Sequence, residues 1–304
     1  MYYGPRDDDF TQFIKRLLRR GNIREKYIEN LTDEESLKFF SYAFTASSCD
    51  RVNNYERFEQ IGDVSVNKFI VWYFYSRFPQ LDCTEGVKIV ARLRINYGAK
   101  KTFASIAESL GFWDFISAQE DGEVMNSSTK YRNRHKKDLL EDTFEAFIGC
   151  VEYILDKKYR PGVGYGIVYD ILTSIFDDLG ISLRFEDLYD AKTRLKETFD
   201  IYQELGDWAF IDNREQNPEN TEFTFAKSKI YLCPPGTTNV PIKKKTGPNK
   251  NDVLNIPQKD WVVIGEGTAA SKNEAQQKAA QQAINYLKRQ GVYREPPEIY
   301  SAIS

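Results

Sequence analysis

The chain has 304 residues, of which 41% are hydrophobic and 29% are charged. These fractions are typical of globular proteins and exclude wholesale disorder, and the length favours two domains over one. Because 42 basic residues are balanced by 45 acidic ones, for a net charge of -3, the overall charge gives no indication of nucleic-acid binding.

The apolar segments and the N-terminal residues indicate a soluble, intracellular protein. The longest apolar stretch, Phe69 to Tyr75, is much shorter than the roughly 20 residues of a membrane-spanning helix. The first residues are acidic and lack the apolar core of a secretory signal. We therefore predict no membrane span.

Cysteine and histidine usage excludes several kinds of site. The four cysteines are scattered without CxxC spacing, so we expect reduced thiols and no zinc site. The only histidine is His135, which argues against His-dependent nucleophilic triads. Any catalysis is therefore expected to depend on carboxylates.

The first half of the chain is predicted to be helical. From residue 10 to about 159, apolar residues recur at intervals of three and four. Thr32 followed by Glu35 fits a capping box at the start of one helix. Residues 44–54 suit a turn region, and the polar segment 121–133 is predicted to be an exposed loop. Further helices are expected at residues 55–78, 87–94, 100–110, 137–153 and 167–179.

The pattern changes after Gly180. Asp190 is expected to cap a short helix that runs to Tyr202. A second capping box, Ser271 to Glu274, opens an Ala-rich helix that ends near Arg289. Between these helices we expect strands at residues 208–212, 222–232 and 261–264. The long segment between the second and third strands is rich in Pro and Gly, carries three consecutive lysines, and is expected to be mobile.

Two groups of acids stand out in the helical half. Glu56, Glu59 and Asp63 are spaced by three and four, and Asp142 and Glu145 by three, so each group lies on one stripe of its helix. The ordinary interpretation is a solvated helix face, because acidic residues are mostly exposed.

The alternative is that the two stripes face each other. Clustered carboxylates repel one another and their pKa values rise unless a cation neutralises them. Magnesium takes oxygen ligands and can activate water for phosphodiester hydrolysis without any histidine. Gly62 and Gly149, which lie beside the acids, would let the two helices approach closely.

At these residues the sequence resembles the ribonuclease III family. Residues 56–63, ERFEQIGD, stand in place of the family signature ERLEFLGD, and residues 142–149, DTFEAFIG, match a second motif, DTxEAxIG. An intermediate element, an acid and a glycine shortly after an FP pair, is similar to Phe78-Pro79 followed by Glu85-Gly86.

The resemblance implies specific roles for these acids. Glu59, Asp63, Asp142 and Glu145 would be the catalytic residues and hold Mg²⁺, for which Mn²⁺ would substitute. Glu56 and Glu85 would be accessory and would shape the substrate cleft or the subunit contact.

Two departures from the family pattern leave these ligands intact. Gln60 replaces an apolar residue of the signature, and Ala46 stands where the family usually has histidine. Because all four ligand positions keep acids, we favour an active enzyme over a degenerate structural relative.

The resemblance also implies a symmetric dimer whose interface is formed by the signature helices. The run 69–75 is apolar almost all round, as in a helix buried between its own core and a partner. An ordinary core helix is the alternative, and the run alone does not separate the two.

The second half resembles a double-stranded RNA-binding domain. Residues 190–197, DAKTRLKE, are similar to its opening helix, and Gly265-Glu266-Gly267 with Ser271-Lys272 and the alanines that follow are similar to its end. Such domains recognise the A-form duplex by its shape.

Of the lysine cluster expected at the start of the last helix, only Lys272 remains, with Lys278 further on. Lys243, Lys244 and Lys245 in the long loop would supply replacement phosphate contacts. A solubilising loop is an equal alternative, and contact with a protein partner through this domain is a third.

The sequence therefore predicts an all-α endonuclease domain at residues 1–182, a small α+β domain of order α-β-β-β-α at 190–290, and a C-terminal tail at 291–304. The implied reaction is Mg²⁺-dependent hydrolysis of double-stranded RNA by a homodimer, leaving 5′-phosphate and 3′-hydroxyl ends. The alternatives are a non-cleaving duplex-binding protein and a structural subunit of a ribonucleoprotein.

Overall fold

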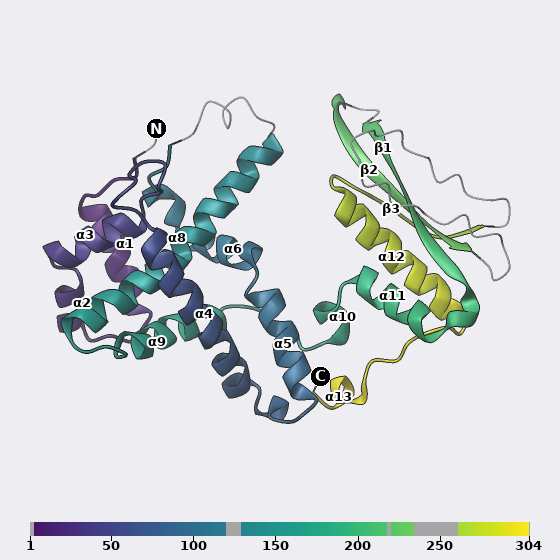
Figure 1. Cartoon of the computed structure of the whole chain (residues 1–304), viewed down its shortest axis with the longest axis horizontal. Coiled ribbons are helices and arrows are strands. Elements are labelled where there is room, and N and C mark those ends of the chain that lie inside the picture. Colours follow the sequence, from purple (N-terminus) through teal and green to yellow (C-terminus); the bar gives the residue numbers. More distant parts are fainter. Residues whose placement is uncertain (1–2, 120–128, 218–219, 234–260, 304) are drawn as a thin grey trace. The chain divides into compact units, whose positions relative to one another are not determined.

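The computed structural model describes residues 3–119, 129–217, 220–233 and 261–303. The chain forms two compact units, residues 1–181 and 182–304 (Figure 1). The predicted loop lysines 243–245 lie outside the described residues.

The first unit is built from helices. A long helix, α8, lies at its centre, with α3, α4, α6 and α9 packed against it. The helices of this unit are α1 (Asp8–Arg19), α2 (Glu25–Leu31), α3 (Glu34–Ala43), α4 (Glu56–Arg77), η1 (Pro79–Leu81), α5 (Gly86–Tyr97), α6 (Lys100–Leu110), η2 (Phe112–Phe115), α8 (Thr129–Lys158) and α9 (Gly164–Asp177).

Aromatic side chains fill much of this core. Phe147 of α8 stacks on Phe40 of α3, with ring centroids 5.9 Å apart, and its other neighbour Phe112 lies at 5.8 Å. Phe69 of α4 meets Phe176 of α9 at 5.0 Å. All five rings are fully buried, so α8 and α4 are held in place by large apolar contacts.

Two local predictions for this unit are wrong. The helix start assigned to Thr32 and Glu35 lies one residue later, because the carboxylate of Asp33 accepts the amide of Ser36 and so provides the cap. The predicted loop 121–133 is too long, since α8 already begins at Thr129. Residues 129–133 contain no Gly or Pro, so this polar part of the predicted loop is compatible with a helix.

The second unit has the predicted order of helix, three strands and helix. Its sheet is antiparallel with strand order β1-β2-β3, and α11 and α12 lie side by side on one face (Figure 1). The elements are α10 (Phe185–Leu188), α11 (Ala191–Ile201), η3 (Gln203–Leu205), β1 (Asp207–Asn217), β2 (Asn220–Cys233), β3 (Val262–Ala269), α12 (Lys272–Arg289) and α13 (Glu298–Ile303).

Both predicted caps of this unit are confirmed. The carboxylate of Asp190 accepts the amide of Thr193 at 3.0 Å, and the hydroxyl of Ser271 accepts the amide of Glu274 at 3.2 Å. They start α11 and α12, the two helices that cover the sheet.

The contact between α12 and β3 explains the Gly and Ala pattern. A β-carbon on Gly265 would lie 2.2 Å from the carbonyl oxygen of Ala279, and one on Gly267 would lie 2.2 Å from that of Ala275. The strand and helix backbones therefore pack with almost no side chain between them. Leu195, Ile230 and Leu287 complete this small core.

The segment 291–304, which the sequence assigns to a tail, contains the short helix α13. Tyr300 of α13 is buried, and its ring lies 5.1 Å from that of Phe185 in α10. Residues 182–189 and 298–303 therefore belong to the second unit. No helix in the described parts of the chain has the length and apolar character needed to cross a membrane.

Candidate active site

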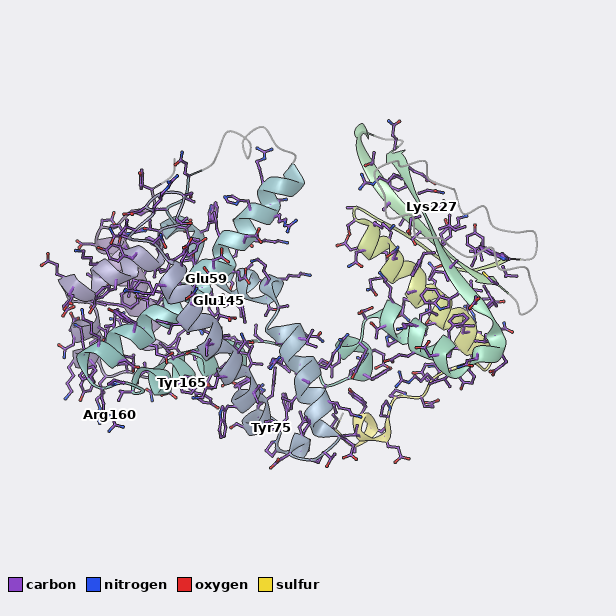
Figure 2. All side chains as sticks on the ribbon, in the orientation of Figure 1. Glu59, Tyr75, Glu145, Arg160, Tyr165 and Lys227 are labelled. Carbon is purple, nitrogen blue, oxygen red and sulfur yellow. The ribbon has the colours of Figure 1, made fainter. Side chains whose placement is uncertain are left out.

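Helices α4 and α8 cross with their backbones in contact at two glycines. A β-carbon on Gly62 would lie 1.8 Å from the carbonyl oxygen of Glu145, and one on Gly149 would lie 2.0 Å from that of Phe58. This confirms the expected close approach. The crossing places both acid pairs close enough for the charge of Glu59 to act on Glu145, and Figure 2 labels the two side chains near each other there.

The acids at this crossing influence one another strongly. Glu145 is 6% exposed, and burial together with the charges of Glu141, Asp63 and Glu59 raises its pKa to about 8. Burial and the charges of Asp142 and Glu141 raise the pKa of Glu59 to about 7. The cluster thus gathers more negative charge than its surroundings neutralise.

Asp142 is fixed by a buried tyrosine. The hydroxyl of Tyr55 donates a hydrogen bond of 3.0 Å to Oδ2 of Asp142. Tyr55 is 8% exposed, and its backbone amide is bonded to the carbonyl of Thr45. Burial and the charges of Asp142 and Glu59 raise the pKa of Tyr55, so its phenol stays protonated and remains a donor.

Lys100, at the start of α6, is a cation at this cluster. Its Nζ contacts a carboxylate oxygen of Glu141 and lies 3.6 Å from Oδ1 of Asp142 and 3.6 Å from Oδ1 of Asp138. Burial acts to lower the pKa of Lys100, but the hydrogen bond to Glu141 and the neighbouring acids outweigh it and raise the pKa.

Sequence patterns did not single out Tyr55, Lys100 or Glu141. Tyr55 precedes the signature and Glu141 precedes the second motif, so adjacency to a motif was the only available signal. Nothing in the spacing connects Lys100 with α8.

The two accessory acids differ in position. Glu56 begins α4, is exposed, and its charge contributes to the raised pKa of Glu59. Glu85 follows the other end of α4, a helix of 22 residues that spans about 33 Å. The accessory role of Glu85 therefore stays a prediction.

The donor set suits a divalent cation. In the residues that the structure describes, no three acidic side chains converge on one point. Carboxylate oxygens are nevertheless the ligands that Mg²⁺ and Mn²⁺ prefer. A cation bound between the stripes would also remove the repulsion that, together with burial, raises the pKa values of Glu59 and Glu145, so the residues present fit such an ion.

The two predicted RNA-binding lysines that the structure describes are both engaged within the protein. Nζ of Lys272, at the start of α12, lies 2.8 Å from Oδ2 of Asp212, and Nζ of Lys278 donates to the carbonyl of Thr268 at 3.1 Å. Lys272 nevertheless remains 62% exposed.

Comparison with known proteins identifies the family to which this chain belongs. Residues 56–154 match the family model described as "Ribonuclease III domain", and residues 237–287 match "Double-stranded RNA binding motif". A protein of Invertebrate iridescent virus 6 named "Putative ribonuclease 3" is 38% identical over 99% of this chain and 95% of its own length. The chain belongs to the ribonuclease III family.

Further relatives of this ribonuclease III protein include viral and bacterial ones. A protein of Frog virus 3 with the same printed name is 37% identical over 90% of this chain and 62% of its own length. "Ribonuclease 3" of Limosilactobacillus reuteri is 29% identical over 77% of this chain and 80% of its own length. The two matched domains identify an endoribonuclease for double-stranded RNA, and the first match spans both acid pairs at the helix crossing.

Proposed function

We propose that Glu59, Asp63, Asp142 and Glu145 bind Mg²⁺, or Mn²⁺ in its place, and that the site hydrolyses duplex RNA to leave 5′-phosphate and 3′-hydroxyl ends. The observation that carries this proposal is the crossing at Gly62 and Gly149, which buries and brings together Glu59 and Glu145, so that burial and the neighbouring acids raise their pKa values.

Each side chain has a separate task in this proposal. Bound divalent cations would supply charge stabilisation and an activated water. Glu145 provides a buried carboxylate at the base of the site, and Asp63 an exposed one. Tyr55 holds Asp142 in one orientation through its hydrogen bond, as outer-shell donors commonly do for metal ligands.

The working unit is a homodimer formed through α4. Phe69, Tyr73 and Phe74 of the aromatic run are buried in the core, but Trp72 is 62% exposed. Val71, Trp72, Tyr75, Pro79 and Asp82 line an open depression of about 530 Å³. The run is therefore apolar on both sides, with one side left for a second copy. Two-fold symmetry would give one duplex two acid clusters.

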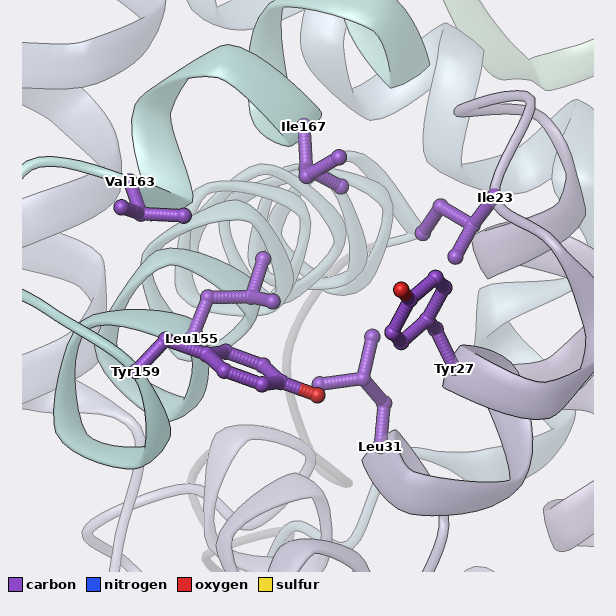
Figure 3. Close-up of a pocket in the computed structure, with 7 residues that line it drawn as sticks. All are labelled: Ile23, Tyr27, Leu31, Leu155, Tyr159, Val163 and Ile167. Carbon is purple, nitrogen blue, oxygen red and sulfur yellow. The ribbon is translucent and has the colours of Figure 1, made fainter.

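A second apolar surface lies elsewhere on the first unit. Side chains in and directly beside α2, the end of α8 and the start of α9 surround a pocket of about 340 Å³ (Figure 3). It is lined by Ile23, Tyr27, Leu31, Leu155, Tyr159, Val163 and Ile167. We assign the dimer contact to the depression beside Trp72 and not to this pocket, because most of that depression is formed by α4, the helix that also carries Glu59 and Asp63.

The second unit would hold the duplex by its shape and phosphates. Lys272 is the exposed cation at the start of α12, and Lys278 lies on the same helix. Lys243, Lys244 and Lys245 remain predicted phosphate contacts. Use of this unit for a protein partner remains the alternative.

The predicted 5′-phosphate and 3′-hydroxyl ends can be tested on the cleaved RNA. We expect that a kinase labels the cleaved RNA only after phosphatase treatment, and that each product has a free 3′-hydroxyl that accepts ligation. Products that are labelled directly would contradict the proposed attack. A titration of Mg²⁺ and of Mn²⁺ should restore cleavage after EDTA treatment, and restoration by neither ion would contradict the proposed cofactor.

A further inference from the structure

We infer that Asp212 of β1 competes with RNA phosphate for Lys272 and thereby limits how tightly this enzyme holds a duplex. The inference rests on the proposed binding of duplex RNA through Lys272, and it assigns to Asp212 the setting of that affinity.

The ion pair itself is the first observation. Oδ2 of Asp212 lies 2.8 Å from Nζ of Lys272, which is the distance of a charge-assisted hydrogen bond. The Lys272 side chain is 62% exposed and that of Asp212 only 19%. The lysine can therefore reach an arriving phosphate, whereas the carboxylate stays at the surface of the sheet.

A second contact keeps Asp212 in place. Nε2 of Gln276, one turn further along α12, donates to the same Oδ2 at 2.9 Å. Oε1 of Gln276 accepts from Nζ of Lys192 in α11 at 2.8 Å. Because the amide bridges two helices and the strand, the carboxylate is held towards Lys272 and is not free to rotate away.

The other carboxylate oxygen makes the competition stronger. Oδ1 of Asp212 is buried and has no hydrogen-bond partner among the described residues. Lys272 is thus the main neutralising partner of a poorly solvated carboxylate, and a phosphate that attracts Lys272 must overcome this attraction.

The second unit as a whole has no excess of positive charge that would compensate for the loss of Lys272 to Asp212. Residues 182–304 contain as many acidic as basic side chains. Without a general attraction for RNA, duplex affinity depends on individual phosphate contacts. The contact of Lys272, which Asp212 opposes, should therefore contribute measurably to that affinity.

The test uses the full chain with a labelled RNA duplex in EDTA, so that binding is measured without cleavage. Asp212→Asn keeps the shape of the side chain but removes its charge. We expect it to bind the duplex roughly two- to fivefold more tightly, as for loss of an ion pair in which Lys272 is exposed and Asp212 is partly buried. The slope of log affinity against log salt should steepen by about 0.7 to 0.9, the value for one further phosphate contact.

Glu274→Gln is the matched control. It removes one negative charge from the same end of α12 but leaves the pair of Asp212 and Lys272 intact. We expect a smaller gain in affinity and an unchanged slope. In the double variant Asp212→Asn, Lys272→Gln, the gain in duplex affinity should disappear, because the lysine that Asp212→Asn would release is absent.

The outcomes separate this inference from the proposed function. If Asp212→Asn and Glu274→Gln change the affinity equally, and Lys272→Gln alone weakens binding, the role of Asp212 is overturned. Duplex binding through Lys272 would still stand in that case. Failure of parent and variants to bind the duplex would overturn both. Asp212→Ser, which also removes the charge, should repeat the gain, and its failure to do so would count against competition.

Discussion

Glu145 is the most buried of the four acids, and the neighbouring charges act on it in the same direction as burial. Its pKa in the folded protein, about 8, lies above that of an unfolded chain, so the folded state binds more protons between these values. The metal-free fold should therefore lose stability as the pH rises from about 4.5 to 8.

Glu145→Gln should remove this cost. We expect the variant to melt at a higher temperature than the parent at pH 8 to 9 in EDTA, with the difference vanishing near pH 5. One pKa unit corresponds to about 1.4 kcal/mol, so the gain is at most about 5 kcal/mol. Melting followed by circular dichroism across this pH range measures it. Exposed Glu34→Gln is the control, and a less stable Glu145→Gln at pH 9 would contradict the argument.

Tyr55 allows a separate test of how Asp142 is oriented. Tyr55→Phe should lower cleavage or metal affinity by about 10- to 100-fold, the usual effect of losing a donor to a metal ligand. Tyr73→Phe is a matched control, because its hydroxyl donates to Asp177 at 2.8 Å in another part of the unit. Equal cleavage by the two variants would show that the Tyr55 bond is not used.

The acids could be predicted from sequence, but their supporting residues could not. Spacing by three and four is a local property of a helix, so the stripes on α4 and α8 were visible in the sequence. Lys100 reaches Asp142 only because α6 packs on α8, and tertiary packing of this kind leaves no periodic signal.

At the scale of elements, the site depends on the distance between α4 and α8. Gly62→Ala or Gly149→Ala would place a methyl group within about 2 Å of a carbonyl oxygen, so the helices must separate. Such overpacking typically costs about 1 to 3 kcal/mol. We expect lower melting temperatures and a large loss of cleavage, because the acid stripes move apart.

Gly166 in α9 is the matched control for this pair. A β-carbon there meets no atom within 4 Å, so Gly166→Ala should be neutral or stabilising by roughly 0.5 to 1 kcal/mol. Full activity of Gly62→Ala in a cleavage assay would contradict the role of the crossing.

Element types were easier to predict than element ends. The capping residues Asp190 and Ser271 act as predicted because each side chain faces its own helix start. At α3, Thr32 and Asp33 are both good caps, and only the geometry shows that Asp33 is used. The start of α8 at Thr129 was missed because its first turns are polar on all sides.

At the scale of the molecule, the exposed side of α4 predicts the oligomeric state. Trp72→Lys should convert a dimer into a monomer in sedimentation experiments, because it places a charge in the apolar depression beside Val71 and Tyr75. Trp72 is exposed in one chain, so the fold of the monomer should survive.

Val163→Lys is the control for this change. It places the same charge in the other apolar pocket, where Val163 is 41% exposed (Figure 3). Dissociation by Val163→Lys and not by Trp72→Lys would move the interface to that pocket. A parent chain that is monomeric at all concentrations would contradict the dimer itself.

The order of a helical unit followed by an α-β-β-β-α unit could be predicted because the periodicity changes near Gly180. The role of the last residues could not. Tyr300 packs on Phe185 across most of the second unit's sequence, and a short helix after a Pro pair has no pattern that reveals its partner.

The most direct test of the central claim is cleavage of a long labelled RNA duplex by the purified full chain, with Mg²⁺ or with EDTA, beside Glu145→Gln. We predict short duplex products only with the parent and only with metal, while Glu145→Gln still binds the duplex. Cleavage by Glu145→Gln at the parental rate, or by the parent in EDTA, would show that the carboxylates at the helix crossing are not the active site.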